Sequence, residues 1–275
     1  MIESPALTEI SGIAASRVNP GVVYVHNDSG DRARFYALDT EARLVGVYEL
    51  DGASLVDCED MAAADGYVYL ADTGDNAGRT GIGSKRRSVF VYRVREPIVG
   101  GAEESGIQKD DAGSARMLSD WTVLELLYPD RAHDAEALMI DSASSSLLLA
   151  TKEDHGPSMV FRAPLEAESP VTLELVAEIP FGTSRAPGHY YATAGDISPQ
   201  GDAVLMRTYG SVLLFPRRPG EAWTATFGRS ALVMPSRFEP QGEAVAFAPD
   251  GLGYFTVSES RRQPLFFYAA SSDCR

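Results

Sequence analysis

The chain has 275 residues, of which 44% are apolar and 23% charged, so it is long and hydrophobic enough to bury a substantial core. Its net charge of −15 opposes binding to phosphate backbones and anionic lipid, because the long-range field repels both. No apolar run approaches the roughly 18 residues of a membrane-spanning helix. We therefore expect a soluble protein that binds neither nucleic acid nor membranes.

The N-terminal residues lack the basic and then apolar layout of a signal peptide. We expect a cytoplasmic protein if Met1 is the native start, or a secreted mature domain if a leader was removed. Cys58 and Cys274 are too few for a disulfide scaffold and do not have zinc-site spacing. A single monomeric domain over residues 1–275 is expected.

Strand-like segments recur along the chain, while helical periodicity is almost absent. A small-residue strand, a turn and a more hydrophobic strand follow one another five times, within residues 11–30, 57–76, 136–154, 195–210 and 243–260. In the second copy, the turn is Asp65-Gly66, a pair typical of tight hairpins. The pattern predicts an all-β protein built on five related hairpins.

Further strand-like runs follow each hairpin, such as RFYALDT and GVYELD after the first. Four strands in a unit of roughly 45 to 60 residues is typical of a β-propeller blade. The stretch VGGAEESGIQKDDAGSA, residues 99–115, is expected to be a solvated loop, although it could hold part of another blade. Five antiparallel four-stranded blades are therefore predicted, with six as the alternative.

The last repeat runs out after three strands. The stretch before Ser11 is predicted to supply the fourth, so that pairing of the N-terminal and C-terminal strands closes the ring. Closure of this kind removes exposed strand edges, which an open array would have to protect.

Polar residues gather where the first strand of each hairpin begins and the second ends. In a propeller the first strand lines the central channel and the second runs antiparallel beside it, so these two ends meet at one mouth. This geometry predicts that Glu59 and Asp60 lie near Asp72 and Asp75. The predicted ligand-binding residues at this mouth are Asn27, Asp28, Asp72, Asp75, Asn76, Lys152, Arg207, Tyr209 and Glu259.

Glu59, Glu136 and Glu243 occupy the same register in three repeats, each two residues before an apolar residue. Unpaired carboxylates within about 5 Å repel strongly, so something must offset their charge. Bound Ca²⁺, nearby cations and protonation are all possible, and a salt-bridge network between blades is the structural alternative. We take these three glutamates and Asp196 as candidate Ca²⁺ ligands, because no Cys/His cluster indicates a transition metal.

Several motifs together resemble a known group of proteins: EISGIAAS, HNDSG, CEDMAAADGYVYLADTGDN, ATKED, AGDISPQGD and GEAVAFAPDG. They are similar to a family of largely uncharacterised bacterial β-propellers that is grouped with phytase-like and esterase-like propellers. The resemblance covers nearly the whole chain. It implies a charged mouth, export and calcium binding, but no settled reaction. Many members carry an aromatic residue where this chain has Cys58, which leaves the local packing there open.

Candidate catalytic groups are three histidines, His26, His133 and His189, since no G-x-S-x-G nucleophile motif is present. Each could be a general base at the mouth, or a capping histidine. The sequence favours a metal-assisted hydrolase of a small polar ester, lactone or phosphoester. A non-catalytic propeller that binds a small ligand or a protein segment is the alternative, and acid/base chemistry without metal is a third.

Overall fold

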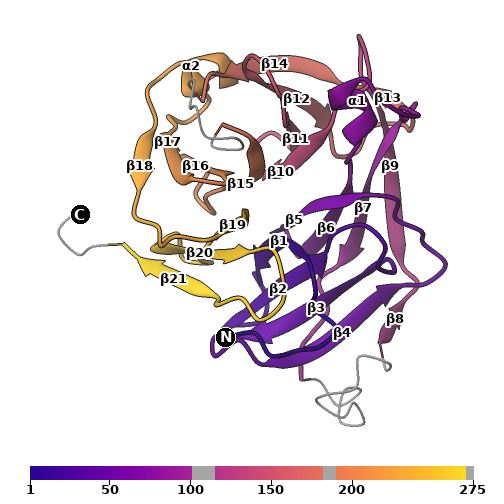
Figure 1. The fold of residues 1–275 in the computed structure, drawn as a ribbon, viewed down its shortest axis with the longest axis vertical. Coiled ribbons are helices and arrows are strands. Elements are labelled where there is room, and N and C mark those ends of the chain that lie inside the picture. Colours follow the sequence, from indigo (N-terminus) through magenta and orange to yellow (C-terminus); the bar gives the residue numbers. More distant parts are fainter. Residues whose placement is uncertain (101–114, 182–189, 271–275) are drawn as a thin grey trace.

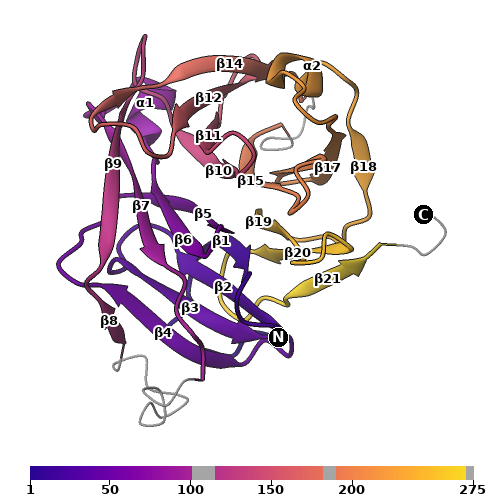
Figure 2. The same cartoon turned by 180° about the vertical axis from the view of Figure 1, so that it is seen from behind.

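The computed structural model describes residues 1–100, 115–181 and 190–270. Its strands form five sheets arranged in a ring about a central axis (Figure 1), which Figure 2 shows from behind. The five-bladed propeller is confirmed, and the six-blade alternative is wrong. Residues 101–114 of the expected loop lie outside the described residues. Within the described ranges, no helix is long and apolar enough to cross a membrane.

The first three blades contain most of the strands. Blade 1 holds β1 (Ile10–Ala15), β2 (Val22–Asn27), β3 (Arg34–Asp39), β4 (Leu44–Leu50) and β8 (Arg116–Leu118). Blade 2 holds β5 (Cys58–Ala64), β6 (Tyr67–Asp72), β7 (Val89–Arg95), β9 (Trp121–Leu127) and β13 (Val171–Thr172). Blade 3 holds β10 (Ala135–Asp141), β11 (Ser146–Thr151), β12 (Ser158–Pro164) and β14 (Glu174–Ile179).

The last two blades are smaller. Blade 4 holds β15 (Ala192–Ile197), β16 (Ala203–Thr208), β17 (Ser211–Pro216) and β18 (Leu232–Met234), and blade 5 holds β19 (Gly242–Phe247), β20 (Gly253–Ser258) and β21 (Phe266–Ala269). Two short helices, α1 (Asn76–Thr80) and α2 (Trp223–Phe227), lie between strands. Strands β8 and β13 pair in parallel at the outer edges of blades 1 and 2, so those two sheets exceed the expected four strands.

The innermost strands β1, β5, β10, β15 and β19 contact one another around the axis and are buried almost throughout. Their small residues follow from this crowding. A Cβ atom on Gly12 would lie 2.3 Å from His26 Nε2, and one on Gly195 would lie 3.1 Å from Met139 Cγ. The centre of the channel is therefore filled with side chains.

Apolar contacts between neighbouring blades form the core, because each blade is too thin to bury its own faces. One buried cluster joins blade 1 to blade 5 through residues such as Ile13 and Val257, and another joins blades 2 and 3 through Leu138 and Val91. Comparable clusters fill the other three interfaces. The ring is therefore stabilised by the removal of apolar surface between successive sheets.

The hairpin turns follow the sequence signals closely. Asp65 and Gly66 have φ values of 53° and 77°, the conformation expected for the predicted tight turn between β5 and β6.

The predicted ring closure by a fourth strand of blade 5 is wrong for the described residues, since that sheet has three strands. The N-terminal segment instead donates one backbone hydrogen bond, from Ile2 N–H to Gln263 O at 3.0 Å, and buries Ile2 and Leu7 in the cluster shared by blades 1 and 5. Pro5 lacks a backbone N–H, and the Leu7 N–H turns back to Ser4 O at 3.3 Å, so a continuous strand ladder is prevented.

A β-bulge recurs near the start of every innermost strand, where the pairing register skips one residue. The skipped residues are Ser11, Glu59, Glu136, Thr193 and Glu243 in blades 1 to 5. Bulges release a residue from the regular ladder and are common beside functional sites. The common register of the three glutamates is therefore confirmed, and Ser11 and Thr193 complete the ring.

Candidate metal centre at the channel mouth

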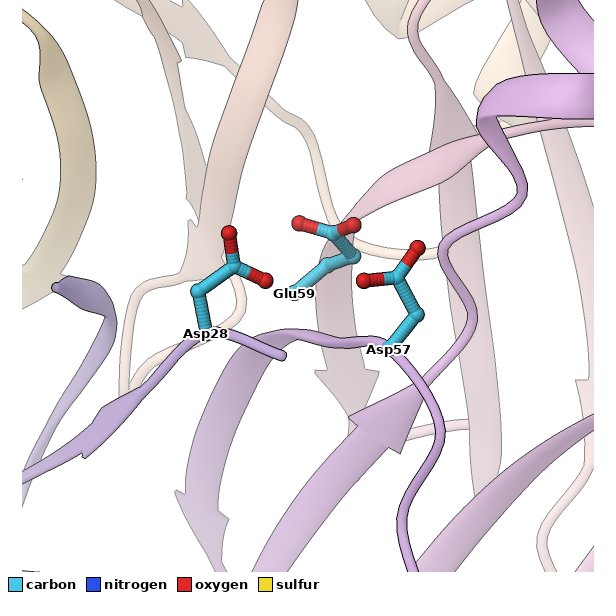
Figure 3. A group of neighbouring side chains, drawn as sticks. All are labelled: Asp28, Asp57 and Glu59. Atoms are coloured by element: carbon cyan, nitrogen blue, oxygen red, sulfur yellow. The ribbon is translucent and has the colours of Figure 1, made fainter. Parts of the chain in front are cut away.

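The mouth is the end of the channel at which the innermost strands begin. Three carboxylates meet there, from Asp28, Asp57 and Glu59, and one oxygen of each lies within 4.8 Å of the other two. Figure 3 shows the three carboxylates turned toward one another. Asp28 directly follows β2, Asp57 directly precedes β5, and Glu59 is the bulge residue of β5. We call these three residues the unpaired triad.

No cation forms a direct ion pair with the unpaired triad among the described residues. Asp57 and Glu59 make no side-chain hydrogen bond or ion pair within residues 1–100, 115–181 and 190–270, and the Asp28 carboxylate accepts only from the backbone of Ser29. Glu59 nevertheless has only 6% of its surface exposed. A buried carboxylate with no partner carries a large desolvation cost, so this arrangement needs a bound cation or a proton.

The backbone holds the unpaired triad in place. The Asp28 N–H donates to Glu9 O at 2.8 Å, and the Asp57 N–H donates to Asp72 Oδ1 at 2.9 Å. Gly74 passes beside the carboxylates, because a Cβ atom there would lie 2.1 Å from Glu59 Oε1 and 2.5 Å from Asp57 Oδ2. A larger residue at this position would displace both carboxylates.

Burial and mutual repulsion both raise the pKa values of the unpaired triad. Burial, followed by the charges of Asp28 and Asp134, raises the pKa of Asp57 to about 6. The pKa of Glu59 is raised well above its usual value by burial and then by Glu136 and Asp28. Burial also raises the pKa of Asp28. In the folded protein, burial and mutual repulsion therefore oppose ionisation of these carboxyl groups.

A second acidic group lies next to the first and shares Glu59. Oxygens of Glu59, Asp134 and Glu136 also lie within 4.8 Å of one another. Here the charges are balanced: Lys152 Nζ donates to Glu136 Oε1 at 2.7 Å, and Arg79 Nε donates to Asp134 Oδ2 at 2.8 Å. Asp134 Oδ1 also accepts the Asp75 N–H at 2.7 Å.

Lys152 serves the third bulge glutamate as well. Burial opposes its charge, but Glu136 and then Glu243 raise the pKa of Lys152 well above its usual value. Burial raises the pKa of Glu243 to about 7, although Lys152 acts in the opposite direction. We call Asp134, Glu136 and Glu243 the paired acids, because each lies beside Arg79 or Lys152. Among the described residues, two groups of carboxylates have oxygens close enough to share a metal ion, and Glu243 belongs to neither of them.

Tyrosines line the side of the mouth near Lys152. Lys152 Nζ lies 5.3 Å from the ring centroid of Tyr209 and 5.7 Å from that of Tyr191. Tyr191 also contacts Tyr190 edge to face, and its hydroxyl donates to Asp154 Oδ1 at 2.7 Å. One side of the mouth is therefore anionic, and the other is aromatic with the paired cations Lys152 and Arg79, since Arg79 Cζ also lies 5.7 Å from the Tyr191 ring centroid.

The two candidate histidines that the structure describes, His26 and His133, have structural contacts. His26 is 1% exposed, its Nδ1 lies 2.7 Å from Asn27 O, and burial lowers its pKa to about 4. His133 is fully buried between Tyr128 and Phe161, with one ring nitrogen 3.2 Å from Glu153 Oε1 and the other 3.1 Å from Asp130 Oδ1. His189 lies outside the described residues.

Several predicted ligand-binding residues instead hold the backbone. Asn27 Oδ1 accepts the Thr8 N–H at 3.0 Å, and its amide donates to Ala6 O at 2.8 Å, so it ties down the N-terminal segment. Asp72 accepts from Asp57 N–H as described and from Arg86 Nη1 at 2.9 Å.

Helix α1 uses two further predicted ligand residues. Asp75 caps its start by accepting the Gly78 N–H at 2.9 Å, and it also accepts the Arg86 N–H at 2.8 Å. Asn76 is exposed and accepts from Arg79 Nη2 at 2.6 Å. These contacts leave both residues with structural roles.

The remaining predicted residues are dispersed around the ring. Arg207 is 1% exposed and pairs with the buried Glu239. Glu259 is half-buried beside Gln241, and burial, followed by the charges of Asp28 and Glu9, raises its pKa.

Asp196 corrects a prediction. We took it as a candidate Ca²⁺ ligand together with the three glutamates, but Asp196 pairs with Leu205 while Ala194 pairs with Arg207. It lies three residues beyond the bulge at Thr193, and therefore near the opposite end of the channel.

The sequence analysis missed Asp57, Asp134 and Arg79. A usable signal was present, since Asp-x-Glu precedes the apolar part of the strand in both DCE (57–59) and DAE (134–136). It also treated Asp60 as a mouth residue. Asp60 is fully buried and accepts backbone N–H groups from Met61 at 2.8 Å, Leu138 at 2.9 Å and Gly195 at 3.2 Å, so it links blades 2, 3 and 4 at the axis.

The chain is distantly similar in structure to several solved proteins. No family model and no curated protein matches the chain. A candidate 6-phosphogluconolactonase from Bacteroides uniformis is 15% identical with a TM-score of 0.45, over 99% of this chain and 71% of that one. Kuenenia stuttgartiensis hydrazine synthase is 10% identical with a TM-score of 0.48, over 98% of each chain.

A nidogen/laminin complex is 12% identical with a TM-score of 0.43, over 92% of this chain and 73% of that one. No residue role is transferred from any of these three structures. The resemblance to phytase-like and esterase-like propellers stays a prediction.

Proposed function

We propose that this propeller binds Ca²⁺ through Asp28, Asp57 and Glu59, and that the occupied mouth binds and hydrolyses a small polar ester, lactone or phosphoester. The observation that supports the metal is the buried Glu59 carboxylate, which has no partner in the described chain and lies with two other carboxylates. Ca²⁺ prefers several hard oxygen ligands, and this donor set contains nothing else. Glu136 is left out of the proposed ligand set because Lys152 already pairs with its Oε1.

When bound, the ion would polarise a substrate oxygen. The chain itself supplies the other requirements of hydrolysis. Lys152 places a positive charge beside the metal ligands. Glu243, whose pKa of about 7 suits a general base at neutral pH, takes the role first considered for the histidines. The tyrosines near Lys152 form a wall against which a substrate could pack.

A non-catalytic binding propeller is the second candidate. It is favoured by one observation: His26 and His133, the two candidate histidines that the structure describes, are both enclosed by structural contacts. Such a protein would use the same ion to hold a small polar ligand without reaction.

Calcium binding is tested first, by isothermal titration calorimetry on protein stripped with EDTA. We expect one Ca²⁺ per chain in the wild type, loss of binding in Glu59→Gln, and normal binding in the control Glu178→Gln, which changes an exposed acid on β14. Absence of wild-type binding would refute the metal centre. Equal binding by the wild type and Glu59→Gln would place the ion elsewhere.

Hydrolysis is tested next with panels of esters, lactones and phosphoesters, with Ca²⁺ or EDTA present. We expect turnover that requires Ca²⁺ and falls by about 100-fold in Glu243→Gln, the usual contribution of a general base. Calcium binding with no turnover across the panels would support the binding propeller instead.

A further inference from the structure

The end of the channel opposite to the mouth holds a second cavity, which the proposed function does not use. The turns that follow β5, β10 and β15 enclose about 270 Å³ together with Arg17, which follows β1. This volume equals that of roughly nine liquid water molecules. Asp60 and the packed centre of the channel lie between this cavity and the unpaired triad.

Arg17 provides the positive side of the cavity. Its Nε donates to Ala63 O at 3.0 Å, which fixes the plane of the guanidinium. Its Nη1 is enclosed without a hydrogen-bond partner, and Arg17 forms no ion pair in the described part of the chain. The guanidinium therefore lies in the cavity wall without a direct ion-pair partner in the described residues, and a ligand carboxylate can supply one.

Asp196 provides the negative side. One of its oxygens accepts the Phe247 N–H at 2.8 Å, and the residue is partly exposed in the cavity wall. Burial raises the pKa of Asp196 to about 6, while the charge of Arg17 lowers it. The two side chains therefore interact electrostatically, yet they do not form a direct ion pair.

Asp141 adds a second unsatisfied acid to the wall. It is 1% exposed, and its Oδ2 accepts from Ser144 Oγ at 2.7 Å and from Arg217 Nη2 at 3.2 Å. Its Oδ1 has no hydrogen-bond partner. Asp141 therefore adds negative charge near the cavity, but its carboxylate is enclosed and held by Arg217.

We propose that this cavity binds a small zwitterion of the α-amino acid class, with its carboxylate on Arg17 and its ammonium group on Asp196. A ligand with only one charge would satisfy one side and leave the other unpaired. A zwitterion satisfies both sides, and its size suits a cavity of about 270 Å³. This binding is independent of the Ca²⁺ centre.

The test is a thermal-shift screen of the twenty L-amino acids, each at about 10 mM, followed by calorimetry on the best binder. Acetate and methylamine are titrated in parallel as the two halves of the ligand. We expect at least one amino acid to bind about tenfold more tightly than either half. No shift with any amino acid, or acetate binding as tightly as the best amino acid, would overturn the proposal.

Variants locate the binding. We expect Arg17→Gln and Asp196→Asn each to weaken the amino acid by about tenfold, whereas the exposed control Arg218→Gln and the mouth variant Glu59→Gln leave it unchanged. Unchanged binding in Asp196→Asn would refute the assignment. The comparison with acetate and methylamine on the wild type decides the question even if Arg17→Gln does not fold.

Discussion

The unpaired triad and the paired acids share one channel mouth, but different features balance their charge. In blade 3, Asp134 and Glu136 contact Arg79 and Lys152 at 2.8 and 2.7 Å. In blade 2, the corresponding Asp57 and Glu59 contact no cation in the described residues.

The difference arises mainly at one position of each blade. This position is the residue that directly follows the second strand of the blade, near the bulge of the first strand. In blades 1 to 5 it is occupied by Asp28, Thr73, Lys152, Tyr209 and Glu259. Lys152 is the one cation among these five residues. The same repeat position therefore carries an acidic group with direct ion pairs in blade 3 and one without them in blade 2, within the described residues.

The largest expected effect is the loss of the paired cation. Lys152→Met leaves Glu136 and Glu243 buried with their main partner gone, so we expect a loss of about 3–5 kcal/mol in the free energy of unfolding at pH 8. Urea denaturation measures it. The double variant Glu136→Gln/Lys152→Met should recover much of this loss, and an undiminished loss in the double variant would show that Lys152 acts through packing.

A smaller effect of opposite sign is expected in the unpaired triad. In EDTA, Glu59→Gln removes a repelled, desolvated carboxyl, so we expect a gain of about 1 kcal/mol in the free energy of unfolding. Glu136→Gln should lower the same quantity, because Lys152 loses its hydrogen-bonded partner. If both variants are destabilised to the same degree, the distinction between the two groups fails.

Gly74 tests the geometry of the unpaired triad without changing any charge. The methyl group of Gly74→Ala would meet Glu59 Oε1 and Asp57 Oδ2, so we expect calcium affinity to fall by about tenfold, or 1.4 kcal/mol. Calorimetry with Ca²⁺ measures this change. An unaltered dissociation constant would mean that the two oxygens do not bind the ion.

The most gradual effect is the pH dependence of the metal-free protein. Raised pKa values mean that the folded state binds more protons than the unfolded state, so stability should fall as the pH rises from about 4 through the values of about 6 for Asp57 and about 7 for Glu243. Thermal melts in EDTA across this range measure the fall. Calcium should remove the part due to Asp57 and leave the part due to Glu243, and equal rescue of both would argue for one larger metal site.

The fold was predictable because each propeller blade repeats a local sequence pattern of alternating strand residues and turn residues. The five hairpin starts, the Asp65-Gly66 turn and the common register of Glu59, Glu136 and Glu243 all depend on strand alternation, which the sequence displays directly. The closing segment was not predictable in the same way. Pro5 and the turn from Ser4 to Leu7 prevent the N-terminal segment from forming a strand, so its apolar side chains pack between blades 1 and 5 instead.

The site was predictable only in outline. Placement at the mouth follows from strand direction, but partner choice depends on side-chain geometry across blades. Asn27 turned to the N-terminal segment, and Asp196 fell three residues past the bulge, where the strand has already carried it away from the mouth. Long-range contacts such as Arg79 with Asp134 have no local signature.

The hydrogen bonds of Asp60 can be completed only after a later part of the chain has been synthesised. Its carboxylate joins β5 to the Gly195 N–H, which lies 135 residues further along the chain. A ribosome must therefore produce more than two thirds of the polypeptide before this inner acid obtains its last donor. Until then, the Asp60 carboxyl lacks one of its three backbone donors. Contacts between residues so far apart in the sequence slow folding. In a chain truncated before blade 4, we expect the innermost strands to pack less tightly around Asp60.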